Sequence, residues 1–309
     1  MAFEIRRMES ADREAVALLI HRSLNAWYLK NRGFELVSGP PETMLVFSRV
    51  YEALDPGCCV LAIDSEKGRI AGSCFFHPRA THVALGIMNV DPDYFGCGAG
   101  GAILREIIKI ADEKKLPLRL VSSAMNLESF SLYNRYGFVP FTFFQDMTVE
   151  VPQGGFEVAP PSGYVVRDAQ SADIAAIVAL ERELCAIERE KDWRFFLDNA
   201  DSIWGLSVLE EEKTGSIDGV CASVLDPGSH MVGPGVARTE KGAAALIRRE
   251  LNRYPGNKPV WLIPSDAPLL RSEMFALGAV NCETHIAQVR GAVIRPTGIV
   301  LPSFMPETA

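Results

Sequence analysis

The 309-residue sequence predicts an α/β protein made of two tandem copies of one domain. The first observation is that strand-like and helix-like patterns alternate along the chain, as they do where helices cover a sheet. The second is a glycine-rich turn between an apolar strand ending at Val90 and an amphipathic helix. The third is a set of residues from the first half that recurs in the same order in the second half.

The elements of the first half follow from local patterns. Ser10–Asp12 follows a short strand and opens a helix with apolar positions at regular spacing. Residues 21–51 are less regular. Two strands joined by a Glu-Lys-Gly turn make a hairpin. The strands expected before the linker are residues 3–6, 59–64, 69–76, 82–90, 116–124 and 141–151.

Glycines at positions 96, 98, 100 and 101 separate the strand that ends at Val90 from the helix that carries Ile103, Leu104 and Ile107. Without Cβ atoms a ligand can approach this backbone closely. The first turn of a helix has unpaired N–H groups, and the helix dipole adds positive charge there. The turn therefore suits a phosphate or pyrophosphate. The alternative is a tight turn whose glycines serve packing alone.

The order of the glycines excludes two nucleotide-binding motifs. It reads G-x-G-x-G-G, not the Rossmann G-x-G-x-x-G, and no Gly-Lys-Ser/Thr opens the helix. The stretch from Val90 and Pro92 through Gly96, Gly98 and Gly100 resembles the acetyl-CoA pyrophosphate loop of the GCN5-related N-acetyltransferase (GNAT) family. That family's loop reads Gln/Arg-x-x-Gly-x-Gly/Ala, and Phe95 stands here where Gln or Arg is usual.

A second segment strengthens the resemblance. Asn126, Ser129, Tyr133 and Gly137-Phe138 are similar to the family's Asn-x-x-Ala-x-x-Leu-Tyr-x-x-x-Gly-Phe, with Ser129 replacing Ala. The resemblance implies two acetyltransferase-like domains, each a central mixed, mostly antiparallel sheet flanked by helices. It also implies transfer of an acetyl group from acetyl-CoA to an amine. Residues 21–51 lie where the family has one wall of its acceptor pocket, and the alternative is a packed helical hairpin with no substrate contact.

Site residues are carried over from the family position by position. A backbone N–H of the strand before the loop would bind the thioester oxygen, Asn126 the pantetheine arm, and Tyr133 would protonate the leaving thiolate. Tyr133 could instead merely pack on its helix. The residues expected to bind acetyl-CoA are Met88, Asn89, Val90, Phe95, Gly96, Cys97, Gly98, Ala99, Gly100, Gly101, Asn126, Ser129 and Tyr133.

Four residues are candidates for the general base that deprotonates the amine. They are His82, His77, Glu42 and Asp146. His82 leads because it begins the strand nearest the expected chemistry and can titrate near neutral pH. Cys97, at a helix N-terminus, could have a lowered pKa and form an acyl-cysteine. Its place in the loop points away from the thioester, so direct transfer is favoured.

A Pro/Gly-rich linker over residues 152–163 separates a domain at 1–151 from one at 164–309. After it, Arg167, Ser171 and Asp173 echo residues 6, 10 and 12, and Gly278 echoes residue 137. Val232-Gly-Pro234 falls where Val90-Asp-Pro92 would. The repeat predicts a second copy of the same fold.

The second copy lacks the glycines of the first. Arg238, Glu240 and Lys241 stand at the positions of Gly96, Gly98 and Ala99 when Val232 and Pro234 are aligned. Glu240 would repel a pyrophosphate and could cap the helix itself. We expect a degenerate domain that binds no cofactor, supports the first domain and lends a wall to its acceptor site.

Composition sets the remaining expectations. A net charge of −8 argues against nucleic acid and anionic membranes and is compatible with an amine substrate. The sequence has no apolar run of 18 residues that could span a membrane, and its N-terminus lacks an apolar signal segment. A cytoplasmic protein is therefore expected. The seven cysteines are expected to be reduced thiols, mostly buried, and no metal site is expected.

The expected function is acetyl-CoA-dependent N-acyl transfer to a small-molecule amine, catalysed by residues 1–151. One alternative is a regulatory protein that senses acetyl-CoA without turnover, and another is a protein-lysine acetyltransferase. The sequence leaves open the acceptor, the acyl chain length and the oligomeric state, including a homodimer. It also leaves open whether the C-terminal strand over residues 284–291 completes its own sheet or reaches across to the first.

Overall fold

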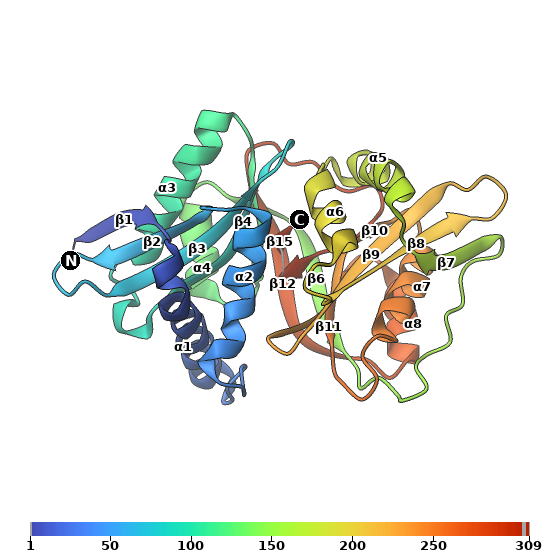
Figure 1. The fold of residues 1–309 in the computed structure, drawn as a ribbon, viewed down its shortest axis with the longest axis horizontal. Coiled ribbons are helices and arrows are strands. Elements are labelled where there is room, and N and C mark those ends of the chain that lie inside the picture. The colour runs from blue at the N-terminus through green and yellow to red at the C-terminus, as the bar shows by residue number, and fades with distance from the viewer. Residues whose placement is uncertain (1, 305–306, 309) are drawn as a thin grey trace. The chain divides into compact units, whose positions relative to one another are not determined.

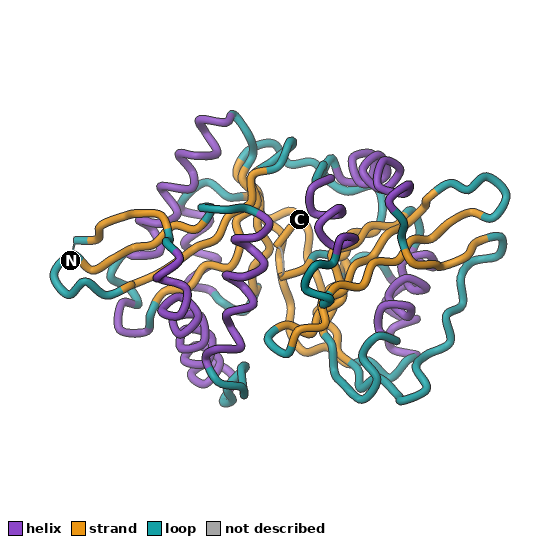
Figure 2. Tube along the Cα trace, in the orientation of Figure 1, coloured by secondary structure: helices purple, strands orange, loops and turns teal. Residues whose placement is uncertain are grey.

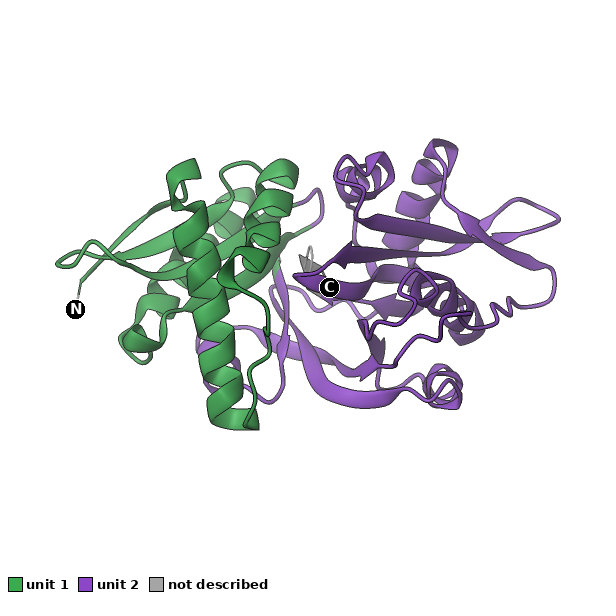
Figure 3. Ribbon diagram, turned by 60° about the horizontal axis from the view of Figure 1, so that its bottom comes forward, with its two compact units in different colours: residues 1–78, 82–118 green, residues 79–81, 119–309 purple. Residues whose placement is uncertain are grey.

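The computed structural model describes residues 2–304 and 307–308. Contacts divide the chain into two compact units (Figure 3). Unit 1 comprises residues up to 78 and residues 82–118, and unit 2 comprises residues 79–81 and the chain from 119 onward. The boundaries at 151 and 164, drawn from the repeat, stay predictions about the two copies. The units instead record which segments pack together.

Unit 1 is an antiparallel sheet with helices on its faces (Figures 1 and 2). The strands lie in the order β1-β2-β3-β4. Its elements along the chain are β1 (Phe3–Arg7), α1 (Arg13–Arg32), α2 (Leu45–Leu54), β2 (Cys59–Asp64), β3 (Ile70–Pro78), β4 (Val83–Val90) and α3 (Ala99–Lys114), with single turns of 3₁₀ helix at Ser10–Asp12, Pro41–Met44 and Pro92–Tyr94.

Opposite faces of this sheet pack on different helices. A Cβ added to Gly72 of β3 would lie 3.0 Å from Ile103 of α3. Asn89 of β4, in contrast, donates from Nδ2 to the Ser23 hydroxyl of α1 at 3.2 Å. Because neighbouring residues of a strand face opposite sides, the side chain of Val90 lies on the α3 face and that of Asn89 on the α1 face.

The segment from 21 to 51 is more helical than expected. α1 continues to Arg32 and ends at Gly33, which has φ of 78°. α2 then covers Leu45–Leu54. These two helices fit the packed helical hairpin, and the role as a wall of the acceptor pocket stays a prediction. Val46, Val50 and Leu54 are buried and form the apolar face of α2.

Unit 2 contains a larger mixed sheet in the order β5-β12-β6-β11-β10-β9-β8-β7, with β13 also paired to β10. The strands are β5 (Leu118–Ser123), β6 (Val139–Thr148), β7 (Tyr164–Asp168), β8 (Trp204–Glu211), β9 (Ile217–Asp226), β10 (Ser229–Ala237), β11 (Val260–Pro264), β12 (Val280–Arg290) and β13 (Ile299–Leu301), with a small pair β14 (Ser303–Phe304) and β15 (Glu307–Thr308). The helices are α4 (Leu127–Arg135), α5 (Ile174–Cys185), α6 (Glu190–Asp198), α7 (Glu240–Leu251) and α8 (Pro268–Ala276). None of the helices among the residues described is long and apolar enough to cross a membrane.

The two halves of the sequence exchange their sixth strands. β12, from the second half, pairs antiparallel with β6 from the first half, and the Ala124 N–H at the end of β5 donates to the Thr284 carbonyl at 2.9 Å. β6 in turn pairs with β11 of the second half. Strand β12 therefore reaches across to the first half. This pairing explains why residues 119–151 pack with the second half.

The sequence echo of Arg6 and Asp12 by Arg167 and Asp173 is also a structural echo. Each arginine forms a two-pronged ion pair with its aspartate, at 2.7 and 2.8 Å in both copies. In each copy the aspartate closes a capping box ahead of the first helix. Two copies of one local structure thus open the two halves of the chain.

Candidate active site

The glycine-rich loop begins where β4 ends, and polar contacts fix its first turn. Asp91 is buried and pairs with Arg22 of α1 at 3.1 Å. Tyr94 is also buried and donates its hydroxyl hydrogen to Asp64 of β2 at 2.8 Å. These contacts tie the start of the loop to elements on either side, so the loop leaves the sheet in a fixed direction.

Gly96 and Gly98 give the loop its conformation. Their φ angles are 77° and 94°, in the left-handed region that favours glycine. A Cβ built on either would meet nothing within 4 Å, so open space lies over both. Gly98 is the N-cap of α3, and the helix has no side-chain cap there. A helix start lacking such a cap, under open space, can hold an anionic group.

Phe95 and Cys97 alternate with these glycines and are exposed. Phe95 is 45% exposed, so its ring lies on the surface of the loop. Cys97 is also exposed, and its thiol lies 3.8 Å from the Phe95 carbonyl within the same loop. All seven cysteines are free thiols, of which Cys59, Cys74, Cys185 and Cys221 are buried.

The candidate bases lie in different surroundings. His82 and His77 are buried in unit 1, and His77 Nδ1 lies 2.7 Å from Asp55. Glu42 is exposed on a single 3₁₀ turn. Asp146, in unit 2, is 2% exposed and contacts Nδ1 of His285 at 2.9 Å, and burial raises the pKa of this carboxyl.

The second motif forms the start of α4 in unit 2. The Asn126 side chain accepts from the Ser129 N–H at 3.0 Å, which makes Asn126 the N-cap of the helix. Tyr133 is 5% exposed, and its ring packs 5.6 Å from that of Phe138. Gly137 then turns the chain with φ of 84°. The structure thus gathers residues 88–101 in unit 1 and residues 126–133 in unit 2.

The corresponding helix start in the second half differs in two ways from our expectation. Val232 and Pro234 lie inside β10, not at the end of a strand, so the alignment on these two residues is wrong. Thr239, not Glu240, is the N-cap of α7, and its side chain accepts from the Gly242 N–H at 3.1 Å. Glu240 instead accepts from the Leu270 N–H at 2.8 Å, at the start of α8.

A strand from the end of the chain lies beside this helix start. β10 pairs in parallel with β11 only at Met231 and Val232, and β13 then pairs with β10 over Gly235–Ala237. A cavity of about 610 Å³ remains near the start of α7, lined in part by Arg238, Glu240 and Asp266. Arg238 already pairs there with Asp218 and Glu183.

Three residues of interest escaped the sequence reasoning: Asp55 beside His77, His285 beside Asp146, and Arg119, which is buried in unit 2. Asp55 is 22 residues from His77 along the chain, and His285 is 139 residues from Asp146. No local pattern links residues at such separations. Arg119 is the one charged residue of its strand, and that isolated charge was the only available signal.

Comparisons with known proteins agree with this geometry. Residues 23–138 match the profile described as the acetyltransferase (GNAT) family. No curated protein sequence matches the chain. In structure the chain is similar to a putative acetyltransferase from Pyrococcus horikoshii, with a TM-score of 0.74, 15% identity, and coverage of 98% of this chain and 95% of that one.

Two further solved structures share the fold. A GCN5-related N-acetyltransferase from Sphaerobacter thermophilus has a TM-score of 0.66 and 18% identity over 94% of this chain and 97% of that one. A tandem GNAT protein from the clavulanic acid biosynthesis pathway has a TM-score of 0.59 and 14% identity over 95% of this chain and all of that one. The likeness over nearly the whole chain fits a fold of two tandem domains, and residues 23–138 are similar to the acetyltransferase (GNAT) family.

Proposed function

We propose that the protein is an acetyl-CoA-dependent N-acyltransferase that moves an acetyl group to the amine of a small molecule. Acyl transfer is the activity of the family whose profile matches residues 23–138, and that family generally uses acetyl-CoA. The finer statements, namely acetyl-CoA in this chain and a small amine as acceptor, are the proposal.

The observation that carries the proposal is the start of α3. Gly98 has φ of 94°, open space lies above it, and no side chain caps the helix. A pyrophosphate placed there would accept hydrogen bonds from first-turn N–H groups such as those of Ala99 and Gly100, and would gain from the helix dipole. We assign the cofactor-binding role to residues 95–101, to the backbone of residues 88–90, and to Asn126, Ser129 and Tyr133.

Acetyl-CoA supplies the thioester, and the chain supplies orientation and proton transfer. In the proposed reaction the amine nitrogen bonds to the thioester carbon and the carbon–sulfur bond breaks. The Tyr133 hydroxyl gives its proton to the departing thiolate. His82 takes a proton from the amine. A phenol and a thiol have ordinary pKa values close enough for such a transfer.

We further propose that the second copy binds no acetyl-CoA. The Thr239 hydroxyl already accepts from the N–H of Gly242 at the start of α7, and β13 pairs with β10 beyond the point where β11 leaves it. Arg238, beside the same cavity, is paired with carboxylates. A cofactor would use the N–H groups at the start of α7 and the edge of β10 beyond β11, and the protein's own groups already occupy both.

Titration of acetyl-CoA into the wild type and into Gly98→Glu, followed by calorimetry, tests the cofactor site. We expect one site per chain in the wild type and none in the variant, because the new side chain is strained at this φ and carries negative charge. Gly163→Glu is the matched control, since Gly163 has φ of 81° and open space above it but lies in the linker. Binding that survives in Gly98→Glu, or a second site, would contradict the proposal.

A sensor that holds acetyl-CoA without turnover would pass the calorimetric test. Release of free thiol in the presence of an amine panel separates the two functions, because only the enzyme produces it. Tyr133→Phe should then bind acetyl-CoA like the wild type and release far less thiol. If no amine causes thiol release from the wild type, the transferase function fails while cofactor binding stands.

A further inference from the structure

Arg119 of β5 is a buried cation without a carboxylate partner. Among the residues that the structure describes, three arginines are buried, and Arg79 and Arg189 each pair with a buried acid, Asp192 at 2.6 Å and Glu181 at 2.5 Å. Arg119 is 6% exposed, and within 4 Å it has no ion pair in the described chain. Its one hydrogen bond runs from Nη1 to the Cys185 carbonyl at 3.5 Å, and its Nε has no partner.

The surroundings offset only part of the cost of burying this charge. A guanidinium stays protonated in proteins, and an unpaired buried charge is strongly unfavourable. Burial lowers the pKa of Arg119 and the nearby Arg189 lowers it further. Glu181, an acid whose charge acts on Arg119, is already bound by Arg189 and by the Trp193 indole N–H at 3.0 Å. The carbonyl end of α5, at Cys185, supplies a partial negative charge only.

A second arginine, which has no acid partner among the described residues, contacts the backbone of the phenylalanine on which Arg119 lies. The guanidinium of Arg119 lies 5.6 Å from the centre of the Phe141 ring. Arg295 donates from Nη1 to the Phe141 carbonyl at 2.7 Å. The segment that carries Arg295 is held in place because the Thr297 N–H donates to the Leu184 carbonyl at 2.8 Å. Arg295 is exposed, so Arg119 is the buried cation of the two and Arg295 lies at the surface beside the same phenylalanine.

We propose that Arg119, assisted by Arg295, binds the carboxylate of a small molecule, and that this molecule is the acceptor amine of the acyl transfer. The planar guanidinium fork matches a carboxylate, which supplies one negative charge for one buried cation. The Phe141 ring offers an apolar wall to the carbon skeleton next to the carboxylate. The acceptor class is therefore an amine that also carries a carboxylate, as amino acids do. Its identity as acceptor rests on the proposed function, whereas carboxylate binding does not.

Thermal unfolding of the full chain with sodium propionate, propionamide or inorganic phosphate at constant ionic strength tests the binding step. Propionate should raise the melting temperature of the wild type, and propionamide should not. In Arg119→Met the response to propionate should disappear, while Arg119→Lys should keep a reduced response. Arg271→Met is the matched control, because Arg271 also donates to a backbone carbonyl, that of Ser265 at 3.1 Å, but remains half-buried on α8.

The melting temperature without any additive tests the role of Arg119 independently. If the site awaits an anion, Arg119→Met removes an uncompensated charge and melts at the wild-type temperature or higher. If Arg119 only holds the end of α5, the melting temperature of Arg119→Met is lower than that of the wild type, and propionate does not change the melting temperature of the wild type. That result would overturn the proposal. A larger response to phosphate than to propionate would overturn the carboxylate assignment.

Thiol release from acetyl-CoA, measured with glycine, β-alanine and L-glutamate and with the corresponding amides, tests the acceptor. We expect the acids to react at least tenfold more efficiently than their amides in the wild type, and this preference to vanish in Arg119→Met. Equal use of acids and amides by the wild type would refute the acceptor class. If propionate binds while no amine releases thiol, the acyl transfer fails and the carboxylate site stands.

Discussion

Two passages from a strand into a helix, from β4 to α3 and from β10 to α7, begin their helices differently. Before α3, the N-cap is Gly98, with φ of 94° and no side-chain cap. Before α7, the N-cap is Thr239, with φ of −132° and a side chain that accepts from Gly242. The first start is open to a ligand, and the second is closed by the protein's own groups.

This difference teaches that the fold and the proposed cofactor site depend on different residues. The fold needs strands, amphipathic helices and capped turns, and both copies keep them, down to the paired Arg6–Asp12 and Arg167–Asp173 contacts. The proposed cofactor site rests on two left-handed backbone positions and an uncapped helix. A few substitutions can remove these without disturbing the core, because they lie outside it. Each prediction below, except the pH dependence of Glu250, alters one copy and uses the other as its control.

The largest expected effect concerns the helix that follows each fifth strand. Tyr133 stands four residues before Gly137 in α4, and the buried Met274 stands four residues before Gly278 in α8. Tyr133→Phe should lower kcat about 10²- to 10⁴-fold, as expected when a general acid is removed. The Kd for acetyl-CoA should stay unchanged. Met274→Leu should leave kcat as it is, and a similar loss in both variants would mean that Tyr133 acts through packing.

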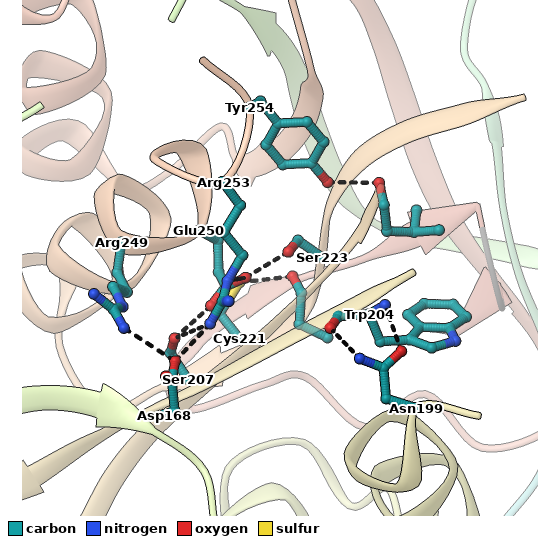
Figure 4. A network of polar contacts seen from close by, with 12 residues as sticks. Asp168, Asn199, Trp204, Ser207, Cys221, Ser223, Arg249, Glu250, Arg253 and Tyr254 are labelled. Carbon is teal, nitrogen blue, oxygen red and sulfur yellow. Dashed lines mark hydrogen bonds and ion pairs between the residues drawn. The ribbon is translucent and has the colours of Figure 1, made fainter. Parts of the chain in front are cut away.

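The next effect concerns charges on α3 and α7. Figure 4 shows Glu250 of α7 pointing into the sheet, where it accepts from Ser207, Ser223 and Arg253. Glu250 is fully buried. Glu250→Ala should cost about 3–5 kcal/mol of unfolding free energy, because Arg253 loses its buried partner. Glu113→Ala on α3 should cost at most ~0.5 kcal/mol, since Glu113 lies exposed 4.0 Å from Lys109. Denaturant unfolding measures both.

The Glu250 carboxyl also predicts a pH dependence. Burial raises its pKa in the folded state. Between the ordinary pKa of a glutamate and this raised value, the folded protein holds a proton that the unfolded chain has released, so stability falls as pH rises. Glu250→Gln should lack this fall. Denaturant midpoints of wild type and Glu250→Gln measured from pH 4 upward check the sign, and parallel profiles would contradict it.

An exchange of the two N-cap residues should have an intermediate effect. Gly98→Thr should weaken acetyl-CoA binding about 10- to 100-fold, because a β-branched residue at φ near 94° is strained by roughly 1–2 kcal/mol and its hydroxyl competes for first-turn N–H groups. Thr239→Gly should cost only a few tenths of a kcal/mol of stability and should not create a second site. Calorimetric titration counts the sites. A second site in Thr239→Gly would show that the cap alone closes the second copy.

The smallest effect concerns the feature that both copies share. Arg6→Ala should cost about 0.5–1 kcal/mol, because its ion pair with Asp12 is partly exposed and screened by solvent. Arg167→Ala should cost slightly more, since Arg167 also pairs with Glu210. The arginines hold the pKa values of Asp12 and Asp173 below the usual range, so this contribution is present near neutral pH and is lost as acid protonates the aspartates. Double-mutant cycles with Asp12→Ala and Asp173→Ala measure the two pairs.

Short-range features of the molecule were predictable from the sequence. The hairpin of β2 and β3, the strand before Val90, the glycine turn and the helix after it all depend on residues within about ten positions of one another. Such patterns predict structure because side-chain period and backbone preference act locally. Asn126, expected from the resemblance to contact a cofactor, was found as the N-cap of α4, a role its residue type also favours.

Only the tertiary structure decided which distant strands pair. Several features depend on residues far apart in the chain. They are the exchange of β6 and β12, the contact of Asp146 with His285, the place of β13 beside β10 and the surroundings of Arg119. The sequence determined that the chain folds as two repeated α/β halves with one glycine-rich turn open at a helix start. Packing determined which half completes which sheet, because strand pairing is fixed by burial of whole faces and not by any local sequence pattern.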